Sequence, residues 1–135
     1  MPGVYTLKLP FDRPPPALWG NARSAHWGRR HEATKLVREA VVVLGRHAKI
    51  PKADFLTVEL IWAPGDRRPR DPNNLAPMSK ACCDALGQAN KNWVHLGLVP
   101  DDSKQYMAQL SPTIEDPPHP PGMWLKITLG RITSQ

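Results

Sequence analysis

The placement of proline is the feature of this sequence that most restricts its fold. The 135 residues include 16 prolines, which gather in the runs PPP and DPPHPP and around a cluster of arginines. Proline fixes φ and lacks a backbone N–H, so helix interiors and central strands cannot pass through these runs. Regular elements must lie between them, and the proline runs mark fixed loops rather than a disordered chain.

Hydrophobic periodicity between the prolines predicts four strands and two main helices. Residues 4–9, 55–62 and 123–129 alternate as half-buried strands do, and residues 106–110 form a weaker strand. Residues 32–47 repeat apolar side chains at helical spacing, including Leu36, Val37 and Val41, with Arg38 on the wet face. A second helix, about residues 76–88, has Pro77 in its first turn. This order predicts an α/β (α+β) class: a two-layer sandwich with a mixed four-stranded sheet, in one domain spanning residues 1–135.

The charge balance points to a polyanionic partner. Eighteen basic residues stand against twelve acidic ones, which gives a net charge of +6 and a pI near 9.7. A domain this basic favours nucleic acid as the partner. No run approaches the roughly 18 consecutive apolar residues of a membrane span, and the N-terminus lacks a secretory signal. Cys82 and Cys83 are neighbours, so we expect buried thiols in a reducing cytoplasm, not disulfides.

The stretch PPPALWGNARSAHWGRR shows no periodicity and is expected to be a long loop. Long ordered loops in compact domains are commonly functional. Two interpretations are open: an arm that contacts DNA, or a loop whose tryptophans, Trp19 and Trp27, are anchored in the core. His26 and His31 lack a second pair at metal-ligand spacing, so they do not predict a zinc site. The donors that such an arm would offer are Asn21, Arg23, His26, Arg29 and Arg30.

The run GDRRPRDPNNLAPMSKACCDAL and the later GLVPDD carry most of the candidate chemistry. Guanidinium groups bind phosphates in bidentate pairs, and clustered side-chain oxygens bind hard cations. Asp71 follows the second predicted strand, and Asp101 and Asp102 precede the third. If these two strands are neighbours, the carboxylates are expected to meet at one edge of the sheet.

Such a cluster suits Mg²⁺, which takes one or two carboxylates together with waters and substrate phosphate oxygens. Bound Mg²⁺ would polarise a scissile phosphate and lower the pKa of an attacking water. Lys80 would stabilise charge in the transition state. Simpler interpretations are also open: aspartate pairs are common in turns, Arg/Asp mixtures form weak surface ion pairs, and Lys80 with Asp84 fits an ordinary pair on a helix surface.

The run RDPNNLAPMSKACCDAL…GLVPDDSKQY resembles the signature of the RusA family of Holliday-junction endonucleases. That signature is an arginine-rich lead, D-x-D-N-L, a lysine on a short helix, D-A-L, and a closing G-x-x-x-D-D. The N-terminal LPFDRPPPALWGNAR is similar to the family's opening strand, proline turn and asparagine. The likeness spans roughly residues 5–110, and the longer gap before the lysine looks like phage-encoded members.

The resemblance implies a Mg²⁺-dependent homodimer, with Mn²⁺ as a substitute, that resolves four-way DNA junctions by paired symmetric nicks in the host cytoplasm. It implies that Asp71 and Asp102 bind metal, with Asp101 adjacent, and that Lys80 is catalytic. Asn73 departs from the family, which has aspartate there, so it offers an oxygen without a charge. A catalytically weakened or inactive branched-DNA-binding protein is therefore the alternative, and an RNA- or protein-binding module a third. The expected DNA-binding residues are Asn21, Arg23, Arg29, Arg30, Arg67, Arg68, Arg70 and Asn74.

Overall fold

The computed structural model describes residues 3–20, 27–87 and 94–132. The two main helices are α1 (Trp27–His47) and α2 (Ala76–Leu86), and two short 3₁₀ helices are η1 (Pro16–Leu18) and η2 (Pro72–Leu75). The strands are β1 (Val4–Leu9), β2 (Leu56–Ala63), β3 (Met107–Gln109), β4 (Thr113–Ile114) and β5 (Gly122–Leu129).

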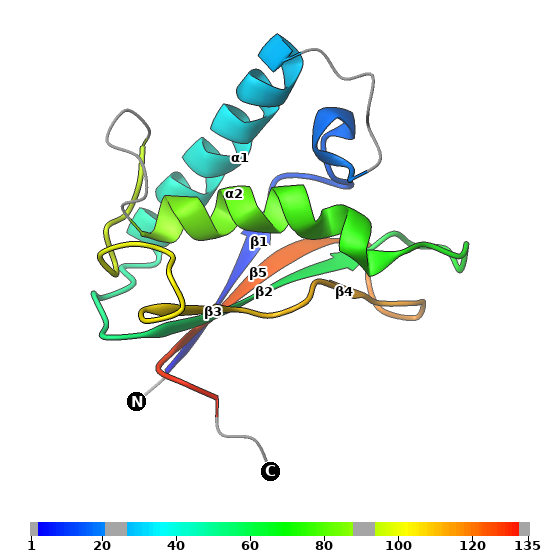
Figure 1. Ribbon diagram of the computed structural model, residues 1–135. Coiled ribbons are helices and arrows are strands. Elements are labelled where there is room, and N and C mark those ends of the chain that lie inside the picture. Colours follow the sequence, from blue (N-terminus) through cyan, green and yellow to red (C-terminus); the bar gives the residue numbers. More distant parts are fainter. Residues whose placement is uncertain (1–2, 21–26, 88–93, 133–135) are drawn as a thin grey trace.

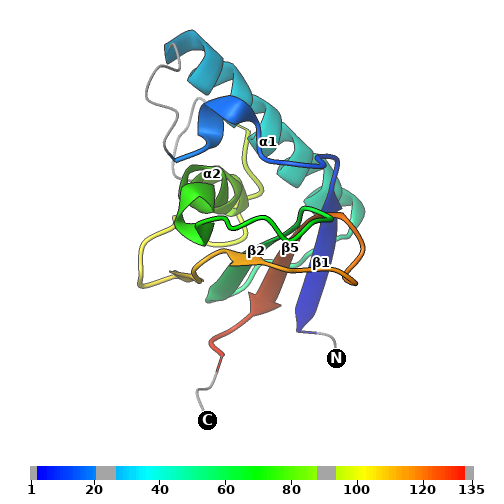
Figure 2. The same ribbon diagram turned by 90° about the vertical axis from the view of Figure 1, so that its right-hand side faces the viewer.

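The strands form one mixed sheet, and both main helices cover the same face of it (Figures 1 and 2). The strand order is β1-β5-β2-β3, with β4 also pairing with β2. β5 is antiparallel to both of its neighbours, whereas β3 and β4 run parallel to β2. The predicted class, a two-layer α+β sandwich, is confirmed. The described residues contain five strands instead of the four predicted, because β4 has two residues and too little length to show alternation.

The core lies between the sheet and the helices, as the alternation predicts. On β2 the side chains of Leu56, Val58, Leu60 and Trp62 are buried, and the facing strand β5 buries Met123, Leu125 and Ile127. A parallel strand must be reached by a crossover connection, which here includes α2 between β2 and β3. The crossover therefore carries the chain from the C-terminal end of β2 back to the N-terminal end of β3.

The helix α2 is buried along most of its length. Its residues that are not buried are Ala76, Pro77, Lys80 and Asp84. Cys82 and Cys83 are buried free thiols, which confirms the prediction for them. The helix ends at Leu86 because Gly87 caps it, with its N–H donating to the carbonyl of Cys83 at 3.3 Å.

The helix α1 departs most from its prediction. It begins at Trp27 instead of residue 32, and Arg38, expected on the wet face, is only 2% exposed. The buried side of the helix is centred on Val37 and Val41. Leu36, by contrast, belonged to the predicted apolar stripe and is 56% exposed. No helix in the described ranges is long and apolar enough to cross a membrane.

Candidate active site

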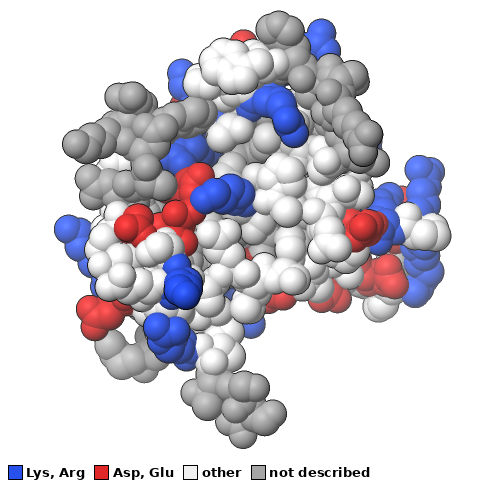
Figure 3. Space-filling view, viewed as in Figure 1, with Lys and Arg blue, Asp and Glu red and all other residues white. Residues whose placement is uncertain are grey.

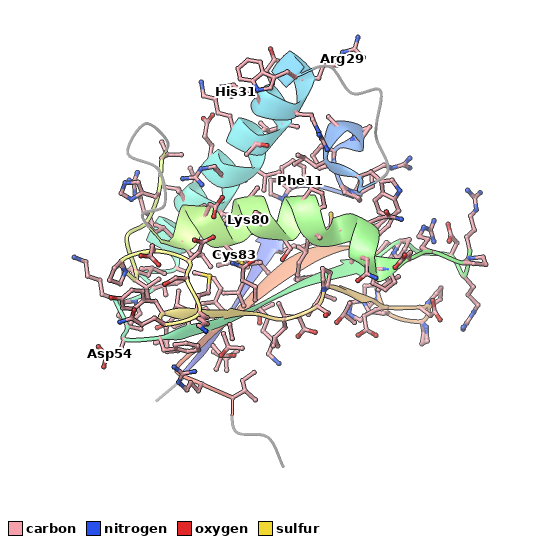
Figure 4. The ribbon with its side chains drawn as sticks, in the orientation of Figure 1. Phe11, Arg29, His31, Asp54, Lys80 and Cys83 are labelled. Carbon is pink, nitrogen blue, oxygen red and sulfur yellow. The ribbon has the colours of Figure 1, made fainter. Side chains whose placement is uncertain are left out.

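Four charged side chains from three segments meet beside the second half of α2. We call Arg38, Lys80, Asp84 and Asp102 the α2 charge cluster. Lys80 Nζ donates to Asp84 Oδ1 at 3.0 Å and also to Asp102 Oδ2. Arg38 Nη1 lies 3.9 Å from Asp84 Oδ2. Figure 4 shows Lys80 projecting from the middle of α2, and Figure 3 shows acidic and basic atoms side by side over this part of the helix.

The fold brings these groups together through α2 and the loop that follows it. Lys80 and Asp84 are one turn apart, so both lie on the exposed strip of a helix whose other sides are packed. Backbone N–H groups of Leu96 and Leu98 donate to the last carbonyls of α2, at 2.7 and 2.9 Å, and lay the loop along the helix end. A Cβ at Gly87 would lie 3.2 Å from the backbone of Asp101, so the glycine permits this close approach.

The electrostatics of the cluster separate the roles of its two carboxyl groups. Burial raises the pKa of Asp84, and the adjacent Asp102 raises it further. The pKa of Asp102 is lowered instead, because its carboxylate accepts hydrogen bonds from Asp84 and from Lys80. Two carboxyl groups whose pKa values are pushed apart are suited to different tasks. Asp102 is therefore the more acidic carboxyl group of the pair, and Asp84 holds a proton more readily.

Lys80 remains a cation in this setting. Partial burial lowers its pKa, but the hydrogen bonds to Asp102 and Asp84 outweigh burial and raise the pKa overall. The Lys80 side chain is 57% exposed, so the ammonium can also reach a ligand in solution. Gln109 Nε2 lies 3.5 Å from Asp102 Oδ2 and adds a neutral donor at the edge of the cluster.

The structure places Asp71 away from this cluster. Asp71 is the N-cap of η2, and its Oδ1 accepts a hydrogen bond from the backbone N–H of Asn73 at 2.9 Å. Roughly 15 Å of helix separates Asp71 from Lys80, at about 2.0 Å per residue in η2 and 1.5 Å in α2. Ligand oxygens lie about 2.1 Å from Mg²⁺, so two ligands of one ion are at most roughly 4 Å apart. Asp71 and Asp102 do not share an ion in this conformation.

The topology explains why the expected meeting of Asp71 and Asp102 does not occur. Asp71 follows the end of β2 and Asp102 precedes the start of β3, and these two strands are parallel. In a parallel pair, the end of one strand and the start of the next lie at opposite edges of the sheet. The crossover helix α2 spans that distance, so its last turns, which carry Asp84, reach the edge where Asp102 lies.

Asp101, a predicted metal ligand, and Asn74, a predicted DNA contact, are engaged in local structure. Asp101 Oδ1 accepts from the backbone N–H of Ser103 at 2.7 Å, which is an ordinary turn contact. Asn74 packs against Gly20, whose N–H donates to the Asn74 carbonyl at 2.9 Å. Within the described part of the chain, no group of three or more His, Cys, Asp or Glu is placed to hold a metal ion. Asp84 and Asp102 are the carboxyl pair that the fold brings together beside Lys80.

The arginine cluster lies at the other end of α2, in the loop between β2 and η2 (Figure 3). Arg70 forms a bidentate pair with Asp66 at 2.6 and 3.2 Å and lies 5.0 Å over the Trp62 ring. Arg67 Nη2 donates to the carbonyl of Pro117 at 2.7 Å. The Arg68 side chain is 81% exposed. Arg70 is therefore committed to the fold, whereas Arg68 is open to a ligand.

A small surface cavity of about 270 Å³ adjoins this cluster. Asp66 on its rim is held as an anion, since the hydrogen bond from Arg70 and then the Arg68 N–H lower its pKa to about 2. The residues lining the cavity are Asp12, Arg13, Trp62, Pro64, Asp66, Arg68, Arg70 and Pro121.

The two tryptophans of the N-terminal segment differ in burial, and each fits a different one of the two interpretations of that segment. Trp19 is partly buried and meets Trp62 edge to face at 5.9 Å, as a core anchor does. Trp27 is 74% exposed and stacks on His31 at 5.0 Å, at the start of α1. Arg29 lies on the same turn (Figure 4), and Arg30 Nε donates to the Ala17 carbonyl at 3.3 Å. The predicted contacts Asn21 and Arg23, together with His26, lie outside the described residues.

Two residues of the α2 charge cluster, Arg38 and Asp84, were not among the site residues predicted from the sequence. Asp84 was assigned to a helix-surface pair with Lys80, and only the strand directions show that its turn of α2 faces Asp102. Arg38 was assigned to the solvent side of α1. A helical face centred on Val37 and Val41 would have placed Arg38 at the margin of the core.

Comparison of the chain with protein-family models and with curated proteins finds no match.

Proposed function

We propose that this protein is a Mg²⁺-dependent endodeoxyribonuclease that nicks four-way DNA junctions, with its active site at the α2 charge cluster. The observation that supports this most is the contact between Lys80 and Asp102, which are 22 residues apart in the sequence. The resemblance to the RusA family implied catalytic roles for both residues. A net charge of +6 agrees with a nucleic-acid substrate.

The donor set of the cluster fits a hard cation. Mg²⁺ is usually bound through one or two carboxylates, with waters and substrate phosphates completing the shell. Asp84 and Asp102 would hold the ion here. When bound, it would polarise the scissile phosphate and lower the pKa of the attacking water. Asp71 and Asn73 lie at the other end of α2 and are not part of this donor set.

The protein's own residues would then act on the phosphodiester as follows. Asp102, whose pKa is lowered, stays ionised and accepts hydrogen bonds. Lys80, still protonated, turns from the carboxylates toward the phosphate and offsets the negative charge that grows in the transition state. Its long, half-exposed side chain allows this movement without a change in α2.

The arginine cluster would hold the same DNA strand away from the cut. The roughly 15 Å of helix between Asp71 and Lys80 corresponds to about four phosphates, at 3.4 Å of helix axis per phosphate on one strand. Arg68, and Arg67 beside it, would contact phosphates there. Arg29 and Arg30 at the start of α1 would add contacts beside Trp27.

A homodimer fits the symmetry of the substrate, because a four-way junction needs two matched incisions. The surface of α1 offers apolar material for an interface. Leu36 and Val43 are seven residues apart, so they lie on one side of the helix, and they are 56% and 64% exposed. We place the reaction in the cytoplasm, which agrees with two free, buried thiols.

The test is a labelled synthetic four-way junction incubated with and without Mg²⁺. We expect paired nicks that need the metal, and we expect Asp102→Asn to abolish them while leaving junction binding intact. Asp101→Asn is the matched control, since Asp101 forms a local turn contact instead of facing Lys80. A wild-type protein that never nicks the junction, or an Asp102→Asn variant that nicks as well as wild type, would refute this assignment.

A second function, junction binding without cleavage, is favoured by a different observation. The first predicted ligand, Asp71, caps η2 far from Asp102, and Asn73 lacks the charge of the family's aspartate. Under this alternative, wild type binds the junction without cutting it, and Asn73→Asp creates activity. Preference for branched DNA over duplex DNA and RNA would separate either function from that of an RNA- or protein-binding module.

A further inference from the structure

Arg38 is the buried cation of the α2 charge cluster. It comes from α1, which is remote in sequence from the other three residues of the cluster, and its side chain is 3% exposed. Its Nη2 donates to the carbonyl of Val94 at 2.9 Å, and its Nη1 lies 3.9 Å from Asp84 Oδ2. The guanidinium thus joins α1, the last turns of α2 and the segment that leads to Asp102.

A charged residue in this position needs a reason, because burying an ion is costly unless it is paired. The neighbours of Arg38 along α1 include the buried Val37, Val41 and Val42. An apolar side chain of similar volume is often as stable as a buried ion pair. Packing alone therefore does not account for an arginine here. Its charge partner Asp84 is the group that can explain it.

The two cations of the cluster differ in their freedom to move. Lys80 is 57% exposed and lies on the open side of both carboxyl groups, whereas Arg38 is enclosed behind Asp84. When Lys80 turns away, Asp84 and Asp102 remain beside each other, and like charges at short range repel. Among the described residues, Arg38 is then the cation that still faces Asp84.

We propose that Arg38 is a positioning residue: a fixed counter-ion that keeps the Asp84 carboxylate next to Asp102 when Lys80 turns to a phosphate or is displaced by a divalent cation. Its role during cleavage rests on the proposed function, whereas its pairing with Asp84 does not. Lys80 is the exchangeable partner of the two carboxyl groups, and Arg38 is the permanent one.

The pairing is tested by thermal unfolding at pH 7.5, without DNA or metal. Arg38→Met is made in three backgrounds: wild type, Asp84→Asn and Lys80→Met. We expect it to lower the melting temperature by about 10 °C in wild type, as the loss of one partner of a buried pair does. We expect a larger decrease with Lys80→Met and a much smaller one with Asp84→Asn. A packing role predicts equal decreases in all three backgrounds, and that result would overturn the proposal.

Two further variants guard against a trivial outcome. Arg46→Met removes an exposed arginine from the same helix and should leave the melting temperature nearly unchanged. If Arg38→Met does not fold, the double variant with Asp84→Asn should fold, because neither charge is then left unpaired. Failure of both to fold would also contradict the proposal.

The consequence for metal binding is measured separately, by Mn²⁺ titration followed by electron paramagnetic resonance. With wild type as reference, we expect Arg38→Met to weaken Mn²⁺ binding at least tenfold and Arg38→Lys to recover part of the loss. Folded Arg38→Met that binds Mn²⁺ as wild type does would overturn the positioning role. If wild type itself binds no Mn²⁺, the proposed metal site fails, and the unfolding comparison still decides whether Arg38 is the counter-ion of Asp84.

Discussion

Replacing Lys80 by methionine removes the exposed cation of the α2 charge cluster and keeps most of the side chain's volume. Lys80 Nζ lies 3.0 Å from Asp84 Oδ1. At that distance the attraction is roughly 5 kcal/mol for an effective dielectric constant of about 20 and roughly 1.4 kcal/mol in water. The side chain is 57% exposed, so screening and side-chain entropy bring the net value toward the lower figure. We expect a loss of about 1 to 2 kcal/mol of unfolding free energy at neutral pH.

The loss should grow with pH because Lys80 bridges two carboxyl groups that repel each other once both are ionised. Without Lys80, repulsion from Asp102 raises the pKa of Asp84 beyond its already elevated value. A carboxyl whose folded pKa exceeds its unfolded value, about 3.9 for aspartate, costs stability as pH rises through the folded pKa. The deficit of Lys80→Met is therefore smaller near pH 4, where the Asp102 carboxylate, whose pKa is lowered, is the group that has lost its cation. It is complete once pH exceeds the raised pKa of Asp84. The Lys80 ammonium, whose pKa is raised, does not titrate in this window.

The measurement is thermal unfolding followed by circular dichroism at several pH values from 4 to 8. A loss of 1 to 2 kcal/mol lowers Tm by about 3 to 8 °C for a domain of this size. Lys35→Met, which removes an exposed lysine from α1, is the control and should change little at any pH. A deficit that is the same at every pH, or no larger than that of the control, would refute the electrostatic account of the cluster.

Three further predictions concern groups outside the cluster. Asp66→Asn should destabilise the protein at neutral pH, because Arg70 lowers the pKa of Asp66 to about 2. The destabilisation should decrease as pH falls from about 3.9 toward 2, which unfolding curves at pH 2 and pH 7 measure. Arg68→Ala should weaken junction binding and reduce the slope of log K against log salt by about one, which electrophoretic titrations at several salt concentrations measure. Leu36→Glu combined with Val43→Glu should shift a dimer to monomer in sedimentation velocity, and an unchanged sedimentation coefficient would exclude this face as the interface.

Most of the fold could be predicted from the sequence, because its periodic segments are bounded by prolines. β1 has the predicted bounds, and β5 begins one residue earlier than predicted. The second helix begins where Pro77 suggested. β4 escaped prediction since two residues give no period. The apolar face predicted for α1 contained the buried Val37 and Val41 but also Leu36, which is apolar yet exposed. The helical spacing of apolar residues does not by itself tell which of them meet the core.

The site was harder to predict, since it depends on the direction of two strands. Sequence order alone gives β2, α2 and β3, and it leaves open whether β3 runs parallel or antiparallel to β2. The parallel pairing places the C-terminal end of α2 beside the start of β3. Lys80 and Asp102 were expected to act together, and they are in contact. The contact between Arg38 and Asp84 could not be predicted from the sequence, because it depends on how α1 packs against α2.

The effect of having asparagine instead of aspartate at position 73 depends on which carboxylate binds the metal together with Asp102. If Asp102 works with Asp71 and position 73, the missing charge lowers metal affinity, and Asn73→Asp should raise activity strongly. If Asp102 works with Asp84, the site keeps two carboxylates, and Asn73→Asp should change the nicking rate by less than a factor of about three. Asp84→Asn should then reduce nicking by at least a hundredfold, whereas under the first arrangement it affects mainly stability. The geometry favours the second arrangement, because Asp84 and Asp102 adjoin Lys80 while Asp71 caps η2.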